Sequence, residues 1–329
     1  MSLVAPTLQA FFTERLIRQR QASPHTVTAY RDTFRQLFTY VANTTGTLPA
    51  QLDFADLEAT TVAGFLTHLE DDRGVSVATR NARLAALRSL FRYASFRHPE
   101  HADLIARVLA IPSKRGDRPL VTFLNKSEID ALLAAPDRTS WTGHRDHALL
   151  AVAIQTGLRV SELTGLRRVD VAIGRGAHVR VMGKGRKERV TPLSKHSVAT
   201  LRVWLEERGG DPEDPVFPSP AGTALGRDAV RKLVVKYARI AAGSCPTLGT
   251  KHVGVHTLRH SCAMTLLDAG VDLATIALWL GHEDLRTVQH YLHADLALKE
   301  RALERTTPPN SKAGRYRPSD PVLAFLDGL

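Results

Sequence analysis

The sequence predicts a mainly α-helical protein of two domains with one small antiparallel β-sheet. Three observations indicate this fold class: apolar residues recur at helical spacing over most of the chain, a single segment alternates as β-strands do, and a polar segment rich in proline and glycine divides the chain. The length of 329 residues agrees, since a domain averages roughly 150 residues. We expect a helical domain over 1–110, a linker over 111–119, a second domain over 120–305 and a tail over 306–329.

The first domain is expected to consist of helices. Its first helix is indicated by apolar residues at helical spacing: Leu8, Phe11, Phe12, Leu16 and Ile17. Ser23 followed by Pro24 supplies an N-cap and a proline at the first helical position of a second helix, which Gly46 ends. The same spacing predicts a third helix over 60–71 and a fourth over 77–96.

The fourth helix carries four arginines on its remaining positions: Arg80, Arg83, Arg88 and Arg92. A run of this kind is commonly a hydrated helix face. It is equally what a helix lying along a phosphate backbone would present. The sequence leaves both interpretations open, and the four arginines are candidate phosphate contacts.

The chain is basic, with 44 Lys and Arg residues against 33 Asp and Glu, and 34 of the basic residues are arginine. The surplus is spread over predicted folded segments, which is typical of phosphate recognition and also of an arginine-preferring genome, so charge alone does not decide. No apolar run approaches the roughly 18 residues of a membrane span, and the N-terminus lacks the pattern of a signal peptide. Two cysteines cannot form a disulfide framework, so we expect a reducing, cytoplasmic setting.

The second domain should begin with a capping box from Asn125 to Glu128 and continue in a helix over 144–155 that Gly157 ends. Alternating β-branched residues over 178–182 and 188–193, around a glycine-rich turn, predict a β-hairpin. Further helices are expected over 197–208, 227–242, 257–269, 273–280 and 284–293.

Two basic residues of this domain stand in turns rather than on long exposed faces. Arg159 follows the helix-ending Gly157, which holds its side chain near a turn, although a simple ion pair with Glu162 would also account for it. Lys184 lies between two glycines in the hairpin turn, where it could reach a ligand or merely be hydrated. Neither residue identifies a function by itself.

A histidine-rich segment raises the question of a metal site. Three residues at spacings of three and four share one side of a helix start: His256, Arg259 and His260. A metal-binding stack would also need His252 inside the helix, yet Gly254 intervenes, and no second cysteine or carboxylate completes a set with Cys262. We therefore expect no metal.

The last unusual segment places His282 in a turn after Gly281, with Tyr291 nine residues later. Tyr291 lies between two histidines on a short polar helix, an odd place for a core aromatic residue. Its alternative role is an amphipathic anchor whose hydroxyl reaches water.

Taken in order, these segments resemble the tyrosine recombinase (phage integrase) family. The resemblance is carried by TGLRVSEL, GKGRKERVTPL, HTLRHSCAMTLLDAG and IALWLGHEDLRTVQHYLH, and it extends over residues 117–305. All six family positions hold the expected residue type: Arg159, Lys184, His256, Arg259, His282 and Tyr291. The N-terminal helices resemble the family's SAM-like core-binding domain in pattern, so the resemblance implies a two-domain clamp around DNA. The chain is most similar to compact Xer-like and transposon-associated members.

The resemblance also implies a role for each residue. Arg159 and Arg259 would clamp the scissile phosphate, and Tyr291 would attack it to form a 3′-phosphotyrosyl bond. His256 would exchange the tyrosine proton. Lys184 would protonate the leaving 5′-oxygen, with Lys187 the competing lysine.

Two residues would support this set: His282 would orient the phosphate, and Glu162 would steady Arg159 or His256. No metal or other cofactor is required, because the basic side chains provide the positive charge.

The implied partners are double-stranded DNA with paired recombination sites, a homo- or hetero-tetramer on that DNA, and accessory proteins. A short apolar helix near the C-terminus, over 319–326, would dock onto a neighbouring protomer, with a frayed terminus or docking on its own domain as the alternatives. Two other functions stay open: a type IB topoisomerase-like nicking and closing enzyme, which uses nearly the same chemistry, and a non-catalytic DNA-binding accessory protein.

Overall fold

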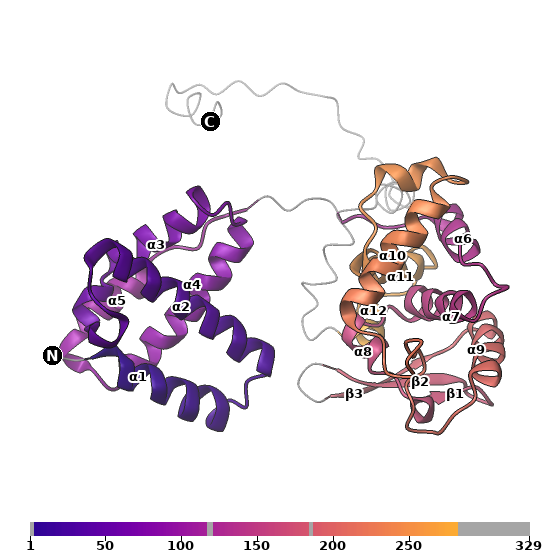
Figure 1. Cartoon of the computed structure of the whole chain (residues 1–329), viewed down its shortest axis with the longest axis horizontal. Coiled ribbons are helices and arrows are strands. Elements are labelled where there is room, and N and C mark those ends of the chain that lie inside the picture. Colours follow the sequence, from indigo (N-terminus) through magenta and orange to yellow (C-terminus); the bar gives the residue numbers. More distant parts are fainter. Residues whose placement is uncertain (1–2, 117–120, 184–186, 282–329) are drawn as a thin grey trace, which may run out of the picture. The chain divides into compact units, whose positions relative to one another are not determined.

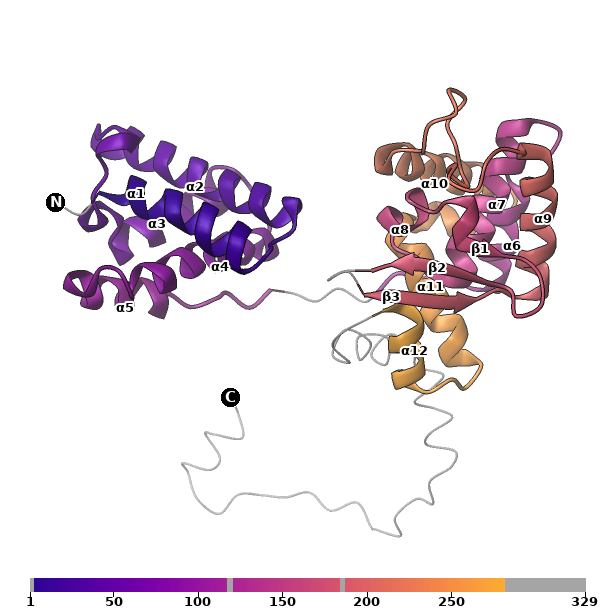
Figure 2. The same cartoon turned by 90° about the horizontal axis from the view of Figure 1, so that it is seen from below.

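The computed structural model describes residues 3–116, 121–183 and 187–281, in two compact units, Met1–Arg118 and Pro119–Leu329 (Figure 1, Figure 2). The first unit is helical, and the second adds a three-stranded antiparallel sheet to its helices. The predicted fold class, mainly α with one small antiparallel sheet, is confirmed. The helix expected over 284–293 lies outside the described residues.

The described part of unit 1 forms a helical bundle around an aromatic core. Its α-helices are α1 (Val4–Ala10), α2 (Pro24–Thr45), α3 (Ala59–Asp71), α4 (Val77–Ala94) and α5 (Ala102–Ala110). The predicted start of α2 is confirmed, since the Ser23 hydroxyl accepts a hydrogen bond from the Thr26 amide at 3.2 Å. Gly46 ends that helix in the left-handed conformation, with φ +74°. The core holds the fully buried rings of Phe11, Phe34, Phe54, Phe65 and Phe91.

The first helix differs from the expected one, because α1 continues as a π-helix over Phe11–Gln19. The wider winding of a π-helix shifts the side-chain positions relative to an α-helix. Leu16 still faces the core, whereas Ile17 is turned outward and is 54% exposed. The α-helical spacing therefore placed one apolar residue on the wrong side.

The first residues of the linker are fastened to unit 1 by α4. Arg80 is buried, donates a hydrogen bond to the Pro112 carbonyl at 3.0 Å and lies 3.7 Å from the Glu70 carboxylate. The Asn81 side chain donates a hydrogen bond to the Lys114 carbonyl at 2.8 Å and accepts one from the Lys114 amide at 3.1 Å. The Lys114 ammonium pairs with Glu70 at 2.8 Å. The linker thus begins as part of the folded domain.

These contacts correct the prediction for Arg80, which is neither a hydrated residue nor a surface available to phosphate. Arg83 reaches the Ala29 carbonyl of α2 at 3.0 Å, and Arg88 donates to the Ile111 carbonyl. Arg92 is exposed, and within residues 3–116 its guanidinium makes no hydrogen bond or ion pair. For Arg83, Arg88 and Arg92 a DNA contact stays a prediction.

Unit 2 is organised around α7 (Trp141–Thr156), which is buried along most of its length and packs against three other helices. Those neighbours are α6 (Lys126–Ala134), α9 (Lys195–Arg208) and α11 (Val255–Asp268). The remaining described helices are α8 (Val160–Thr164), α10 (Arg227–Ala241) and α12 (Leu273–Leu280). Figure 1 shows α8 close to the sheet. No helix of the described residues is both long and apolar enough to span a membrane.

The predicted capping box is present at the start of α6, where Asn125 and Glu128 cap each other's backbone amides. Three other helices begin earlier than predicted. Ser140 and Ser194 cap α7 and α9 by accepting amide hydrogen bonds at 3.1 and 3.2 Å, and Gly254 precedes α11. Serines in polar segments left these starts ambiguous in the sequence.

The sheet contains β1 (Val171–Ala172), β2 (His178–Met182) and β3 (Glu188–Pro192), in that order. The hairpin of β2 and β3 was predicted, and the short β1 was not. Val181 pairs with Arg189 across the hairpin, and residues directly opposite share a face of the sheet. Because Val181 faces the core, Arg189 also points inward, while Val190 is 55% exposed. In β3 the charged Arg189 therefore faces inward and the apolar Val190 faces outward.

The anchored linker leads to a first prediction. Replacing Arg80 by alanine leaves the Pro112 carbonyl without its donor, so we expect unit 1 to lose about 1–3 kcal/mol of unfolding free energy. Trypsin should then cleave faster after Lys114 and Arg115 in the full-length chain. Arg92→Ala removes an exposed arginine of the same helix and should change stability by less than about 0.5 kcal/mol. Equal stability and equal cleavage rates in the two variants would contradict the anchoring.

Candidate active site

Two helix ends meet at the centre of the candidate site. Gly157 ends α7 with φ +62° and Gly281 ends α12 with φ +65°, both left-handed conformations that glycine adopts without strain. A Cβ on Gly157 would lie 2.5 Å from Leu280, so glycine is also needed for these ends to pack. The last carbonyls of a helix lack intrahelical donors and carry partial negative charge. The site therefore begins as a cluster of acceptors.

The two arginines of the predicted phosphate clamp satisfy these acceptors. Arg259, buried on α11, donates to the Gly157 and Leu280 carbonyls, each at 2.6 Å. Arg159, directly before α8, donates to the Gly281 carbonyl at 2.8 Å. Side chains a hundred residues apart in sequence thus both bind the end of α12, and Arg259 also binds the end of α7. The free-energy cost of burying the Arg259 charge is low, because the negative C-terminal ends of two helix dipoles face it.

Glu162 joins this cluster as a buried carboxylate. One of its oxygens accepts from the backbone amide of Arg159 at 2.8 Å, and the other accepts from the Arg159 guanidinium at 2.9 Å. Burial works to raise the pKa of Glu162, but the hydrogen bond and charge of Arg189 and the contacts from Arg159 outweigh it and lower that pKa. Glu162 is therefore ionised at neutral pH and pairs with both arginines. Of its two predicted partners, Arg159 and His256, the structure shows a contact with Arg159.

Sequence reasoning missed Arg189, whose guanidinium binds both oxygens of Glu162, at 2.7 and 2.8 Å. An alternating strand usually buries its apolar residues, and by that rule Val190 rather than Arg189 would face inward. The hairpin register was the available signal. With Val179 and Val181 inward on one strand, the residues opposite them, Thr191 and Arg189, must face the same way.

The histidines of α11 occupy different environments. His256 is exposed in the first turn, and its ring stacks on that of half-buried His260 with centroids 6.3 Å apart. His252 lies in the loop before the helix, as Gly254 predicted. Within residues 3–116, 121–183 and 187–281, no group of three or more His, Cys, Asp or Glu side chains is arranged to hold a metal ion.

Three of the predicted catalytic residues, Lys184, His282 and Tyr291, lie outside the described residues. The structure describes what leads to them. Gly183, immediately before Lys184, closes the hairpin by donating its amide to the Lys187 carbonyl at 2.8 Å. Gly281, immediately before His282, ends α12 as predicted.

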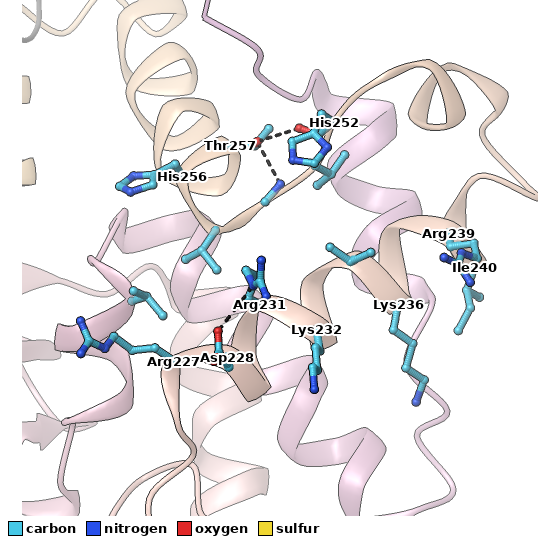
Figure 3. Close-up of a pocket in the computed structure, with 15 residues that line it drawn as sticks. Arg227, Asp228, Arg231, Lys232, Lys236, Arg239, Ile240, His252, His256 and Thr257 are labelled. Atoms are coloured by element: carbon cyan, nitrogen blue, oxygen red, sulfur yellow. Dashed lines mark hydrogen bonds and ion pairs between the residues drawn. The ribbon is translucent and has the colours of Figure 1, made fainter. Parts of the chain in front are cut away.

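A groove of about 850 Å³ extends along α10 and reaches His256 and Val160 (Figure 3). Its rim carries five exposed basic residues of α10: Arg227, Arg231, Lys232, Lys236 and Arg239. Asp228 is the acidic residue among the groove-lining positions, and it lies 3.6 Å from Arg231. Sequence reasoning missed these cations, although the spacings of four (Arg227 to Arg231 and Lys232 to Lys236) and three (Lys236 to Arg239) would have indicated them. The groove is a positively charged surface next to a predicted catalytic histidine.

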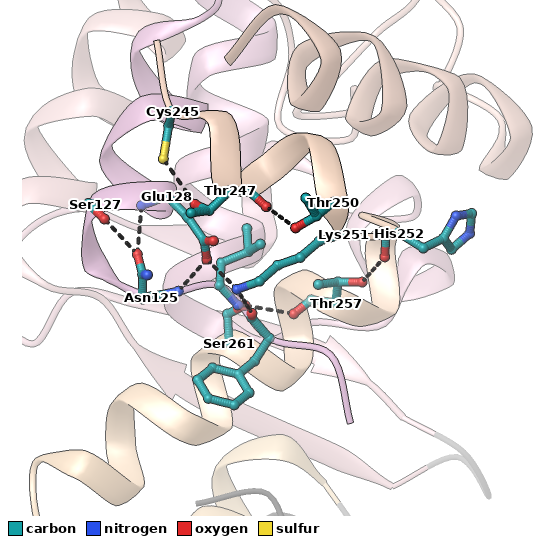
Figure 4. A network of polar contacts seen from close by, with 12 residues as sticks. Asn125, Ser127, Glu128, Cys245, Thr247, Thr250, Lys251, His252, Thr257 and Ser261 are labelled. Atoms are coloured by element: carbon teal, nitrogen blue, oxygen red, sulfur yellow. Dashed lines mark hydrogen bonds and ion pairs between the residues drawn. The ribbon is translucent and has the colours of Figure 1, made fainter. Parts of the chain in front are cut away.

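A polar network fixes the start of α11 (Figure 4). The Lys251 ammonium, just before the helix, binds the fully buried Glu128 carboxylate at 2.7 Å and the Phe123 carbonyl at 2.9 Å. Burial works to raise the pKa of Glu128, whereas the hydrogen bonds from Lys251 and Asn125 lower it overall. The Ser261 hydroxyl makes a second link by accepting a hydrogen bond from the Leu124 amide at 2.8 Å. The segment before α6 thus holds the helix that carries His256 and Arg259.

Comparison with known proteins gives one consistent result. The profile of the Phage integrase family matches residues 122–297, and that of the phage integrase N-terminal SAM-like domain matches residues 10–98. An integrase/recombinase of Sinorhizobium fredii, named y4rC, is 53% identical over 99% of this chain and 98% of its own length. A tyrosine recombinase XerC of Xanthomonas campestris is 36% identical over 86% of this chain and 83% of its own.

Solved structures agree in fold. The XerH site-specific recombinase bound to its palindromic difH substrate superposes with a TM-score of 0.70 at 24% identity, over 87% of this chain and 81% of that one. The Tn1549 transposon integrase in complex with a circular intermediate DNA gives a TM-score of 0.68 at 14% identity, over 93% of this chain and 100% of that one.

The environment of His260 leads to a second prediction. Burial, together with the positive charges of His256 and Arg259, lowers the pKa of His260 from 6.5 to about 4. Between those two pH values the unfolded chain binds a proton at His260 that the folded chain does not bind. The free energy of unfolding therefore has its full value above pH 6.5 and falls as the pH drops toward 4.

We expect the urea midpoint to fall between pH 7.5 and 5, and His260→Asn to reduce that fall. His25→Asn, which removes an exposed histidine of unit 1, should leave the fall unchanged. A His260 ring resonance that titrates near pH 6.5 in NMR spectra would contradict this account.

Proposed function

The chain belongs to the phage integrase family, the tyrosine recombinases, and from this premise we propose which of its residues carry the reaction. Its activity is site-specific DNA recombination, in which strands are cleaved and rejoined through a 3′-phosphotyrosyl intermediate. One observation carries the residue assignment: Arg159 and Arg259 converge on the helix ends from which the chain continues into His282.

We propose that the two arginines bind the scissile phosphate. A phosphodiester gains negative charge on its non-bridging oxygens during attack, and guanidinium groups stabilise that charge bidentately. The contacts of Arg159 and Arg259 with backbone carbonyls hold both groups in position before DNA arrives, so little reorganisation is needed during the reaction. His282 follows directly after Gly281, which suits its assignment as a further donor to the phosphate.

The nucleophile in this proposal is Tyr291. Its hydroxyl oxygen forms a bond to phosphorus while the bond from phosphorus to the 5′-oxygen breaks. A phenol has a pKa of about 10, so His256, exposed at the start of α11, accepts the phenolic proton. Lys184 donates a proton to the leaving 5′-oxygen. Strand joining runs the same steps in reverse with a 5′-hydroxyl from the partner duplex, and the stored phosphoester makes an external energy source unnecessary.

DNA is the partner of this family, and we propose that the basic face of α10 contacts its backbone. Five cations along one helix next to His256 would follow a phosphate strand toward the site. The XerH and Tn1549 neighbours are named as complexes with substrate DNA and with a circular intermediate DNA. We further propose a homo- or hetero-tetramer on two paired sites, in the cytoplasm, with accessory proteins that select integration, excision, resolution or transposition.

The nucleophile assignment predicts a covalent adduct. A nicked substrate whose short leaving fragment diffuses away should trap the wild-type chain on DNA, visible as a shifted band under denaturing electrophoresis. Tyr291→Phe should abolish the adduct because it lacks the attacking oxygen, while gel-shift binding of intact DNA persists. An adduct that survives Tyr291→Phe would mean that another residue is the nucleophile.

The same assay separates the other functions. An accessory protein would form no adduct with the wild-type chain. A topoisomerase would form the adduct and reseal one duplex, without joining strands of two duplexes.

The α10 assignment predicts a change in salt dependence. Lys232→Ala should weaken DNA binding and reduce the slope of log affinity against log salt by about 1, since one phosphate contact is lost. Arg175→Ala makes the same charge change in the exposed turn between β1 and β2, at the opposite end of β2 from the Gly183 turn, and should keep the wild-type slope. Equal slopes for the two variants would place the DNA elsewhere.

A further inference from the structure

Arg189 is the one member of the cluster to which the proposed chemistry gives no role. Its two terminal nitrogens bind both oxygens of Glu162, at 2.7 and 2.8 Å, which is the strongest geometry for an arginine and a carboxylate. The Glu162 side chain is 4% exposed and that of Arg189 is 12% exposed, so water screens this pair weakly. The side chain of Arg159 is 30% exposed and shares the same carboxylate.

The charges of the three side chains decide how strongly Arg159 can act on a phosphate. One buried carboxylate paired with Arg159 alone would neutralise that guanidinium and hold it in place. With Arg189 present, the two arginines and Glu162 carry a net charge of +1. Because Arg189 is the more buried partner and binds bidentately, it provides the neutralising charge, and the more exposed Arg159 keeps its own charge for DNA.

Arg189 also lies near Gly281 and Gly183, the residues that precede His282 and Lys184 in the sequence. A Cβ on Gly281 would lie 2.9 Å from a terminal nitrogen of Arg189 and 3.1 Å from its Cδ, so the guanidinium lies against this turn. A Cβ on Gly183 would lie 3.6 Å from the same nitrogen and 3.7 Å from Glu162. The Arg189 side chain therefore lies beside Gly183, binds the carboxylate of α8 and lies against Gly281.

We propose that Arg189 is a positioning residue for strand cleavage, which neutralises Glu162 so that Arg159 stays available to the scissile phosphate. It contacts no substrate in this proposal and acts through Glu162. The inference rests on the proposed function, since it concerns the same phosphate site.

The test measures single-turnover adduct formation on the nicked substrate with four full-length proteins: wild type, Arg189→Met, Glu162→Gln and the double variant. Arg189→Met should reduce the cleavage rate roughly 100-fold, the loss typical of one misplaced electrostatic group. The double variant should regain at least tenfold over Arg189→Met, because a neutral glutamine no longer holds the Arg159 guanidinium. DNA affinity should stay within about threefold of wild type throughout.

A purely structural role gives a different pattern, because removing a second buried partner would then lower the rate and the melting temperature further. Arg167→Met is the matched control: Arg167 pairs with Asp170 at 3.2 Å outside this cluster, and its loss should leave the cleavage rate unchanged. If Arg189→Met does not fold, Arg189→Lys replaces it, with an expected loss of about tenfold and the same rescue by Glu162→Gln.

The outcomes separate the two proposals. Absence of an adduct with the wild-type protein would overturn the proposed function. A wild-type adduct together with undiminished cleavage by Arg189→Met, or with a double variant slower than the single one, would overturn the role of Arg189 alone.

Discussion

The candidate site depends on arginines that satisfy the unpaired carbonyls of two helix ends. A buried guanidinium needs several acceptors, and the last carbonyls of a helix need donors. Arg259 donates hydrogen bonds to the Gly157 carbonyl at the end of α7 and to the Leu280 carbonyl at the end of α12, so each side satisfies the other. The chain that leaves these ends carries Arg159 on one side and His282 on the other. The contact that stabilises the fold is therefore also the one that assembles the site.

The positive charge of the chain is divided among different tasks. In unit 1, Arg80 donates a hydrogen bond to the Pro112 carbonyl at the start of the linker and pairs with Glu70 of α3. In unit 2, the exposed cations of α10 stay on the surface beside the groove, while Arg189 lies inside and balances Glu162. Net charge left a phosphate-binding partner open, but burial decides which arginines can meet one.

Features that arise from neighbouring residues were predictable. The capping box at Asn125 and the glycine ends at Gly157 and Gly281 follow from backbone groups within a few residues, so the sequence contains all that is needed. The early helix starts at Ser140 and Ser194 are equally local, and they were missed because a serine in a polar segment fits a loop as well as a cap. Ile17 was misplaced because periodicity assumes one helix type, and the chain winds as a π-helix there.

Helical periodicity and one alternating segment predicted the fold class, and the order of the motifs carried the resemblance to the recombinases, although no single motif identified a function. The sequence did not disclose that Arg189 shares Glu162 with Arg159, or that Arg80 belongs to the interior. These are contacts between residues distant in sequence, and an inward-facing arginine contradicts the pattern by which interiors are recognised. Burying a charged residue is stable only when a partner group compensates its lost hydration. When that partner is distant in sequence, only the tertiary structure identifies it.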